Sequence, residues 1–128
     1  MAAPVDIGTL IVSTPGTLGG RPRIAGTRIG VETVAILWKQ GYTAEDIVNG
    51  VFTDLRLDQV HAALSYYFAN RDAVDRRVME DDLAGVTGNI DALSEGSGPP
   101  WLSAEERAIR IHELELEAAL LRSRLGLK

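Results

Sequence analysis

Residues 19–30 hold the sequence feature that most constrains the fold, a polar stretch with four glycines, one proline and three arginines in twelve residues. Glycine adopts positive φ angles and proline fixes φ, so we expect a shaped turn between short extended segments. Ile24 and Ile29 are apolar enough to anchor this turn on a core. The turn then points its three arginines outward, Arg21, Arg23 and Arg28. It is either a loop that binds an anion or a partner, or a hairpin whose arginines are merely solvated.

The segment before this turn has the pattern of a strand, and the segments after it have the patterns of helices. Residues 9–13 are β-branched and apolar, and residues 23–25 and 27–29 could pair back against them, although hairpins this short need packing to be stable. A helix is predicted over residues 31–40, closed by Gly41, and a second over residues 43–50, with Thr43 as its N-cap. A third is predicted from residue 57 to about residue 82.

The C-terminal third of the chain is predicted to be an appendage. Residues 85–100 are rich in glycine, proline and serine, which is typical of a linker. Ser103 and Glu106 form a capping box at the start of an amphipathic helix over residues 104–125. We therefore expect a helical domain over residues 1–84, a linker over 85–100 and a C-terminal helix within 101–128.

The apolar residues of this last helix predict a surface for a partner. A heptad seam runs through it, and Leu116 and Leu120 add a second apolar flank. The seam is short for a sustained coiled coil, so self-association and docking on another protein both stay open. The residues expected to bind the partner are Trp101, Leu102, Ile111, Leu114, Ala118, Leu121 and Leu125.

The charge is unevenly distributed along the chain. Residues 1–78 carry eight basic and eight acidic side chains, whereas residues 79–128 carry five basic and ten acidic ones, which account for the net charge of −5. A broad basic surface for nucleic acid is therefore excluded, although the arginine-rich turn could still contact phosphates. The chain has no cysteine, no apolar run long enough to span a bilayer and no signal peptide at its start, which predicts a cytoplasmic protein.

Candidate catalytic chemistry is scarce. The two histidines, His61 and His112, lie far apart without metal-like spacing, and no P-loop or dinucleotide fingerprint is found. Asp81 and Asp82 are adjacent and cannot face each other across a site. We expect no catalytic residue, no metal site and no cofactor, so an enzyme or a small-ligand sensor with the arginines as an anion cradle is the least favoured reading.

The three predicted helices have the lengths and connections of a trihelical, homeodomain-like helix-turn-helix core, whose third helix would enter the major groove. Arg56 and Gln59 are placed to read guanine and adenine edges, on a face shared with Ala62 and Tyr66. The expected fold is mainly α, with a short N-terminal β-like hairpin, a flexible linker and a C-terminal amphipathic helix. The residues expected to bind DNA are Arg21, Arg23, Arg28, Arg56 and Gln59.

Three motifs together resemble the domain-of-unknown-function family 433. They are the loop GRPRIAGTRI at residues 20–29, the segment GYTAEDI at 41–47 and the segment LDQVHAALSYY at 57–67. The resemblance covers roughly residues 9–70 and departs at Arg56, where a Thr or Ser N-cap is usual. It implies a VapB-type antitoxin that binds a PIN-like ribonuclease toxin and represses its own operator DNA.

Two functions follow as expectations. The first is an antitoxin-like, DNA-binding regulator that binds its toxin through the C-terminal helix. The alternative is a non-enzymatic adaptor or assembly protein that docks on a larger partner through residues 101–128. A homodimer is expected in both cases, because so short a domain has a thin core and more aromatic surface than that core needs.

Overall fold

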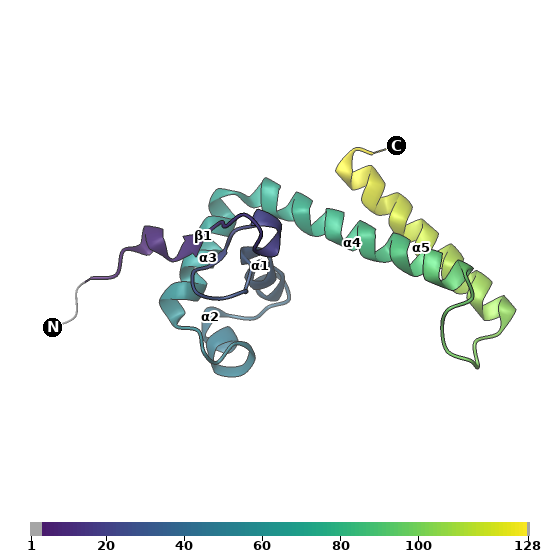
Figure 1. Cartoon of the computed structure of the whole chain (residues 1–128), viewed down its shortest axis with the longest axis horizontal. Coiled ribbons are helices and arrows are strands. Elements are labelled where there is room, and N and C mark those ends of the chain that lie inside the picture. The colour runs from purple at the N-terminus through teal and green to yellow at the C-terminus, as the bar shows by residue number, and fades with distance from the viewer. Residues whose placement is uncertain (1–3, 128) are drawn as a thin grey trace. The chain divides into compact units, whose positions relative to one another are not determined.

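The chain is mainly helical with a small two-stranded sheet, and it divides into two units, Met1–Val74 and Asp75–Lys128. The computed structural model describes residues 4–127. Figure 1 labels the elements that are named below. Each unit has its own apolar core, so each is described by itself.

The first unit begins with extended segments and turns and continues with short helices. Its elements are, in chain order, η1 (Ile7–Thr9), β1 (Ile11–Val12), η2 (Leu18–Gly20), β2 (Arg23–Ile24), α1 (Val31–Lys39), α2 (Ala44–Asp46), η3 (Ile47–Val51) and α3 (Leu57–Ala69). The strands pair antiparallel, with Ile11 opposite Ile24 and Val12 opposite Arg23. The predicted pairing of residues 23–25 with the first strand is thus confirmed, whereas the segment at residues 27–29 folds back on β2, where the Ile24 amide donates to the carbonyl of Ile29 at 2.9 Å. The helix predicted over residues 31–40 is also confirmed.

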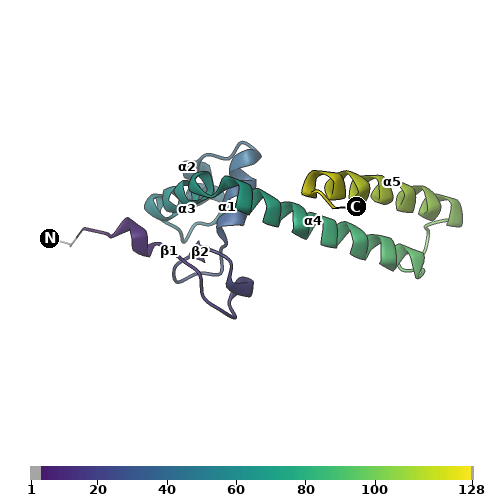
Figure 2. The same cartoon turned by 90° about the horizontal axis from the view of Figure 1, so that it is seen from above.

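Helix α3 is the centre of the first core. It contacts α1, α2, η3 and both strands, as the two ribbon views show (Figures 1 and 2). Val60, Ala63 and Tyr67 are each 0% exposed on its inner side. Ile24 from β2 is also wholly buried in this core, so the glycine- and arginine-rich turn is anchored there as the sequence predicts.

The first two helices end and begin as their sequence signals predict. Gly41 follows α1 with φ 99°, and its amide donates to the carbonyl of Trp38. Thr43 caps α2: its Oγ1 accepts from the amide of Asp46 at 3.1 Å, while an Asp46 carboxylate oxygen accepts from the amide of Thr43 at 2.9 Å. The second helix is nevertheless shorter than predicted, because η3 continues it as a π-helical turn.

The predicted end of the third helix is wrong, because the helix ends at Ala69 and not near residue 82. Asn70 leaves the helical conformation, with φ −130° and ψ 38°, and its side-chain amide donates to the carbonyl of Tyr66 at 3.1 Å. Asparagine competes for backbone groups in this way and so favours helix ends. A new helix, α4 (Arg71–Ser94), starts directly after it.

The second unit is an antiparallel pair formed by α4 and α5 (Ala104–Leu125), which Figure 1 shows in green and yellow. The predicted linker over residues 85–100 is therefore wrong for residues 85–94, which are helical, and the loop is confined to residues 95–103. Each glycine costs a helix about 1 kcal/mol. Burial of an apolar seam against α5 offsets this cost, and its members are Met79, Leu83, Val86, Ile90 and Leu93.

Polar contacts close both ends of this helical pair. Arg76 donates to the carbonyl of Leu125 at 3.1 Å, and Arg107 donates to the carbonyl of Leu93 at 2.9 Å. The predicted cap of α5 is present, since Ser103 Oγ accepts from the amide of Glu106 at 3.0 Å. Within the described residues, no helix has the length and apolar character that crossing a membrane requires.

Candidate functional site

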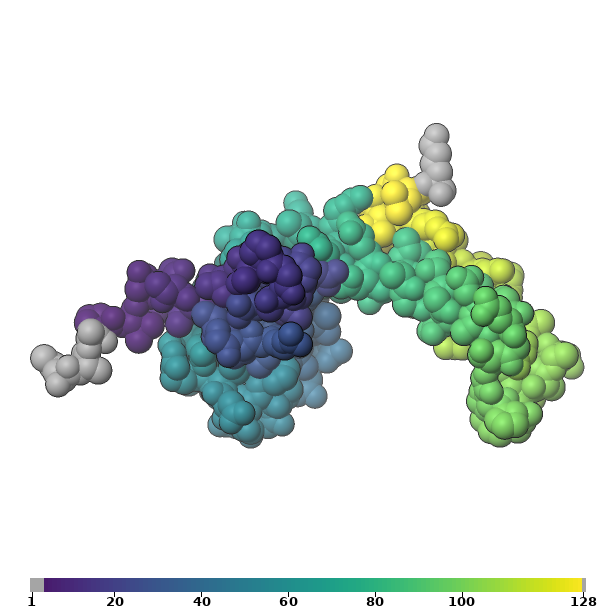
Figure 3. All heavy atoms as spheres, viewed as in Figure 1, coloured from purple at the N-terminus to yellow at the C-terminus, as the bar shows by residue number. Residues whose placement is uncertain are grey.

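The glycine- and arginine-rich turn is a hydrogen-bonded loop built around Thr27. The Thr27 hydroxyl donates to the carbonyl of Ile24 at 2.8 Å and accepts from the amide of Ile29 at 3.0 Å. Gly26, with φ 78°, supplies the left-handed turn that places Thr27 there. The next residue, Arg28, consequently lies at the tip of the loop, and Figure 3 shows this part of the chain on the surface.

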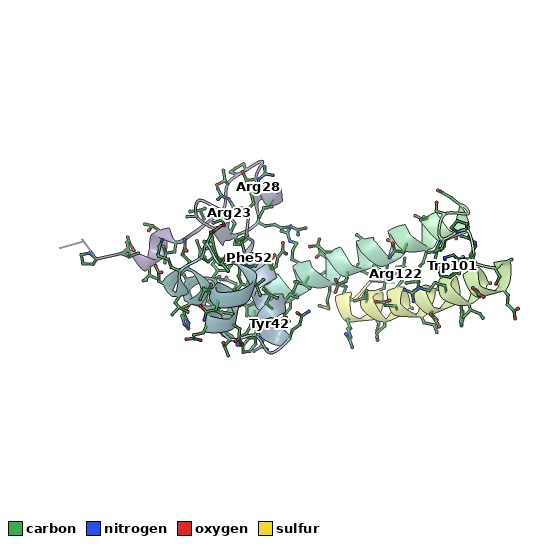
Figure 4. All side chains as sticks on the ribbon, turned by 90° about the horizontal axis from the view of Figure 1, so that it is seen from below. Arg23, Arg28, Tyr42, Phe52, Trp101 and Arg122 are labelled. Carbon is green, nitrogen blue, oxygen red and sulfur yellow. The ribbon has the colours of Figure 1, made fainter. Side chains whose placement is uncertain are left out.

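The three arginines of this loop have different surroundings. Arg21 forms an ion pair with Glu32 at 2.9 Å, in which both side chains are largely buried. Arg23 donates to the Thr27 carbonyl at 2.9 Å and to the Thr14 hydroxyl at 3.0 Å, so it braces the loop from inside. Arg28 is exposed, and among the described residues it has no hydrogen bond or ion pair (Figure 4).

A cavity of about 420 Å³ opens between this loop and the segment before α3. The loop contributes Arg28 and Ile29, the segment contributes Phe52 and Asp54, and Gln59 comes from α3. Its walls therefore carry one cation and one carboxylate together with apolar surface. The sequence holds one signal for the wall before α3, the apolar pair Val51 and Phe52 inside a connecting segment, but this pair does not by itself predict a site.

The start of α3 uses the two residues that were expected to read bases. The Gln59 side-chain oxygen Oε1 accepts from the Arg56 amide at 2.7 Å, which is the reciprocal half of a capping box, although Arg56 has no hydroxyl to complete the box as a Thr or Ser would. The Arg56 guanidinium donates two hydrogen bonds to the Asp58 carboxylate, of 3.0 and 3.2 Å. The hydrogen bonds from Arg56 lower the pKa of Asp58 below its ordinary value, and the Coulomb attraction of the guanidinium acts in the same direction.

The outward face of α3 also differs from the prediction. Ala62 was placed on the exposed face but is only 6% exposed, because α3 is packed on several sides by the other elements of its unit. Leu57, His61 and Ser65 lie on the exposed face instead. The exposed face of α3 therefore does not include Ala62.

An exposed aromatic patch lies where the C-terminal ends of α1 and α3 meet. Trp38 is 36% exposed and Phe68 is 48% exposed, and their rings meet edge to face at 5.0 Å. The Arg71 guanidinium lies 5.9 Å from the Phe68 ring, and Lys39 Nζ lies 5.4 Å from the ring of the buried Tyr67 beneath. We call these five residues, three aromatic side chains and two cations, the aromatic patch. The sequence indicated such a surface, because it has more aromatic side chains than so small a core needs.

The predicted partner-binding face of the last helix is largely occupied within the chain. The heptad seam packs against α4, because two facing apolar seams bury each other when α4 and α5 pair. Trp101 is 76% exposed, and Leu102 and Ile111 are half-buried. The seam residues that this pairing buries are Leu114, Ala118, Leu121 and Leu125.

Among the described residues, no group of three His, Asp or Glu side chains could hold a metal ion. Fold and surface together define a small helical domain with a braced arginine loop and an exposed aromatic patch, joined to a helical hairpin. The model of the family described as protein of unknown function (DUF433) matches residues 11–67. The chain belongs to this family.

A solved structure supports the same assignment. The crystal structure of a DUF433 member protein from Anabaena variabilis is 33% identical to this chain, with a TM-score of 0.51. The similarity covers 55% of this chain and 68% of that one. No curated protein matches. The resemblance drawn from the three motifs is thus confirmed at the level of the family, whose function is not known.

Proposed function

We propose that this chain is a non-enzymatic, cytoplasmic partner-binding protein of the antitoxin type, which neutralises a PIN-like nuclease by binding it. The observation that carries the proposal is the aromatic patch. Trp38 and Phe68 expose their rings on a rigid helical core, and Arg71 lies beside them. Tryptophan and arginine are enriched at the energetic centres of protein interfaces, where aromatic residues in general are frequent.

The patch also has the physical properties of a preorganised binding surface. Trp38 and Phe68 hold each other edge to face, and both rest on Tyr67, whose ring is wholly buried. Little rotamer freedom is left to lose when a partner covers them, so more of the contact energy appears as affinity. The neighbouring cations favour a partner with carboxylates around an apolar centre.

This placement changes which part of the chain is proposed to receive the nuclease. The sequence pointed to the C-terminal helix, but the seam of α5 is covered by α4. We therefore propose that the nuclease binds the first unit, and that the helical hairpin of the second unit serves self-association of the chain. The adaptor function is the alternative, and it shares the partner-binding step but not the neutralisation of a toxic activity.

The test is affinity capture from the native host, identification of the captured protein, and titration of the purified pair. We expect Phe68→Ala to weaken binding at least tenfold, because it removes a ring at the centre of the patch. Leu57→Ala is the matched control: Leu57 is 41% exposed on the same helix, but about 16 Å away along it. Equal binding by the wild type and Phe68→Ala would contradict the assignment.

DNA binding is a second candidate, favoured by Arg28. This guanidinium is exposed at the tip of its loop, beside the cavity that Gln59 of α3 also lines. Arg56 and Gln59 are held at the helix start, so the proposed contacts are with phosphates and not with bases.

We expect Arg28→Ala to weaken binding to operator DNA and to reduce the salt slope by about 1, because one phosphate contact is lost. Fluorescence anisotropy on DNA upstream of the gene measures both quantities. Arg77→Ala, which removes an exposed arginine on α4, is the control for net charge. If both variants bind alike, or if the wild type shows no binding at low salt, the DNA proposal is overturned.

A further inference from the structure

Helix α5 carries a second apolar stripe on the side that faces away from α4. Its buried seam includes Leu114 and Ala118, which are 3% and 1% exposed. The residues two positions further along lie on the opposite side of a helix with 3.6 residues per turn. Leu116 and Leu120 occupy these positions, and they are 59% and 53% exposed. Ile109, 55% exposed, extends the stripe by two turns toward the helix start.

We propose that this outer stripe binds the same stripe of a second copy of the chain, with the two α5 helices antiparallel. The spacing is self-complementary about residue 118. Leu116 and Leu120 are equally far from it, and so are Ile109 and Leu127, which is 49% exposed just after Gly126. An antiparallel pair with its twofold axis at this point therefore sets each apolar side chain opposite another one.

The charges beside the stripe select the same arrangement. Glu113 and Arg124 lie on one flank of the stripe, at nearly equal distances from residue 118 on either side. Antiparallel pairing brings Glu113 of each copy to Arg124 of the other, whereas parallel pairing places this flank of the two copies on opposite sides of the interface and makes no such ion pair. Arg124 has no hydrogen bond or ion pair among the described residues, and Glu113 holds only the exposed Arg110, at 3.3 Å.

A groove in the second unit fits the end of the second copy. It has a volume of about 430 Å³, and Leu102 and Ile109 of α5 and its approach line it together with Leu93 and Pro99. In the antiparallel pair, Leu127 of the second copy comes beside Ile109. An exposed apolar side chain and an apolar groove thus meet in this register, and the groove gains an occupant of matching chemistry.

The proposed interface is small, because one helix of each copy supplies most of it. It lies at or below the roughly 1,200 Å² that stable complexes bury at the low end, so we expect a dissociation constant in the micromolar range. The inference does not depend on the proposed function, because the aromatic patch belongs to the first unit and the stripe to the second. Its failure would leave the antitoxin proposal untouched.

Sedimentation equilibrium of the full chain tests the dimer. We expect a reversible monomer–dimer equilibrium, weakened at least 100-fold by Leu116→Glu combined with Leu120→Glu, since four carboxylates would meet at the interface. Glu115→Gln, a charge change on the same helix outside the stripe, is expected to leave the equilibrium unchanged. If the chain is a monomer at all concentrations up to about 100 µM, or if the dimer survives the double substitution, the proposal is overturned.

Charge reversal tests the register. Glu113→Arg and Arg124→Glu should each weaken the dimer about tenfold, because each turns two attractive contacts into repulsive ones. The two substitutions together should restore the dissociation constant to within about threefold of the wild type. Both residues are exposed, so the hairpin stays folded, which circular dichroism checks. Two weakened single variants without restoration in the double variant would exclude the antiparallel register.

Discussion

Tyr67→Ala is expected to lower the free energy of unfolding of the first unit by about 3–5 kcal/mol, the range for removing a buried aromatic ring. The ring is 0% exposed and is the largest wholly buried side chain of the core. It contacts Trp38 and Phe68, with centroid distances of 6.3 and 5.4 Å, so the cavity left behind cannot close without disturbing the aromatic patch. A domain of this size has only a few kcal/mol of stability, so the variant should be largely unfolded.

Urea unfolding monitored by tryptophan fluorescence measures this effect. The chain has two tryptophans, so Trp101→Phe leaves Trp38, next to Tyr67, as the reporter. Tyr42→Ala is the matched control, because Tyr42 is 40% exposed and its removal should cost less than about 1 kcal/mol. Equal losses in the two variants would show that Tyr67 is not central to this core.

Ala118→Glu is expected to separate the helical hairpin. Ala118 is 1% exposed in the seam between α4 and α5, in one apolar cluster with Val86 and Leu114. Moving a carboxylate from water into an apolar seam costs several kcal/mol, which exceeds what so small a core provides. The glycines of α4 then lose the burial that offsets their cost, so the C-terminal part of α4 should fray together with α5.

Hydrogen exchange of the amides in α5 follows this separation. We expect protection over Ala104–Leu125 to fall by at least 100-fold in Ala118→Glu, while protection in α3 stays as in the wild type. Ala108→Glu serves as the control, because residue 108 is exposed on the same helix and receives the same side chain. Retained protection in Ala118→Glu would mean that the hairpin does not depend on this seam.

Local signals in the sequence predicted several helix ends well, in both units. Gly41, Thr43 and Ser103 set helix ends through hydrogen bonds within a few residues, so no tertiary information was needed. The same holds for the loop, where glycine and Thr27 define a turn by themselves. The family assignment rests on these local motifs, and the match over residues 11–67 confirms it.

The errors arise where packing outweighs local composition. Gly85 and Gly88 indicated a linker, but the apolar residues around them recur at alternating intervals of four and three, from Met79 to Leu93. This seam makes residues 85–94 helical once α5 covers it, and it takes the face of α5 that was expected to meet a partner.

Growth of the native host is the most direct measurement of the proposed neutralisation by the first unit. The captured partner is expressed alone, with the wild-type chain, with Phe68→Ala and with Leu57→Ala. We predict that the partner alone arrests growth, that the wild type and Leu57→Ala restore it, and that Phe68→Ala does not. Unimpaired growth with the partner alone, or full restoration by Phe68→Ala, would contradict a toxin neutralised through the aromatic patch.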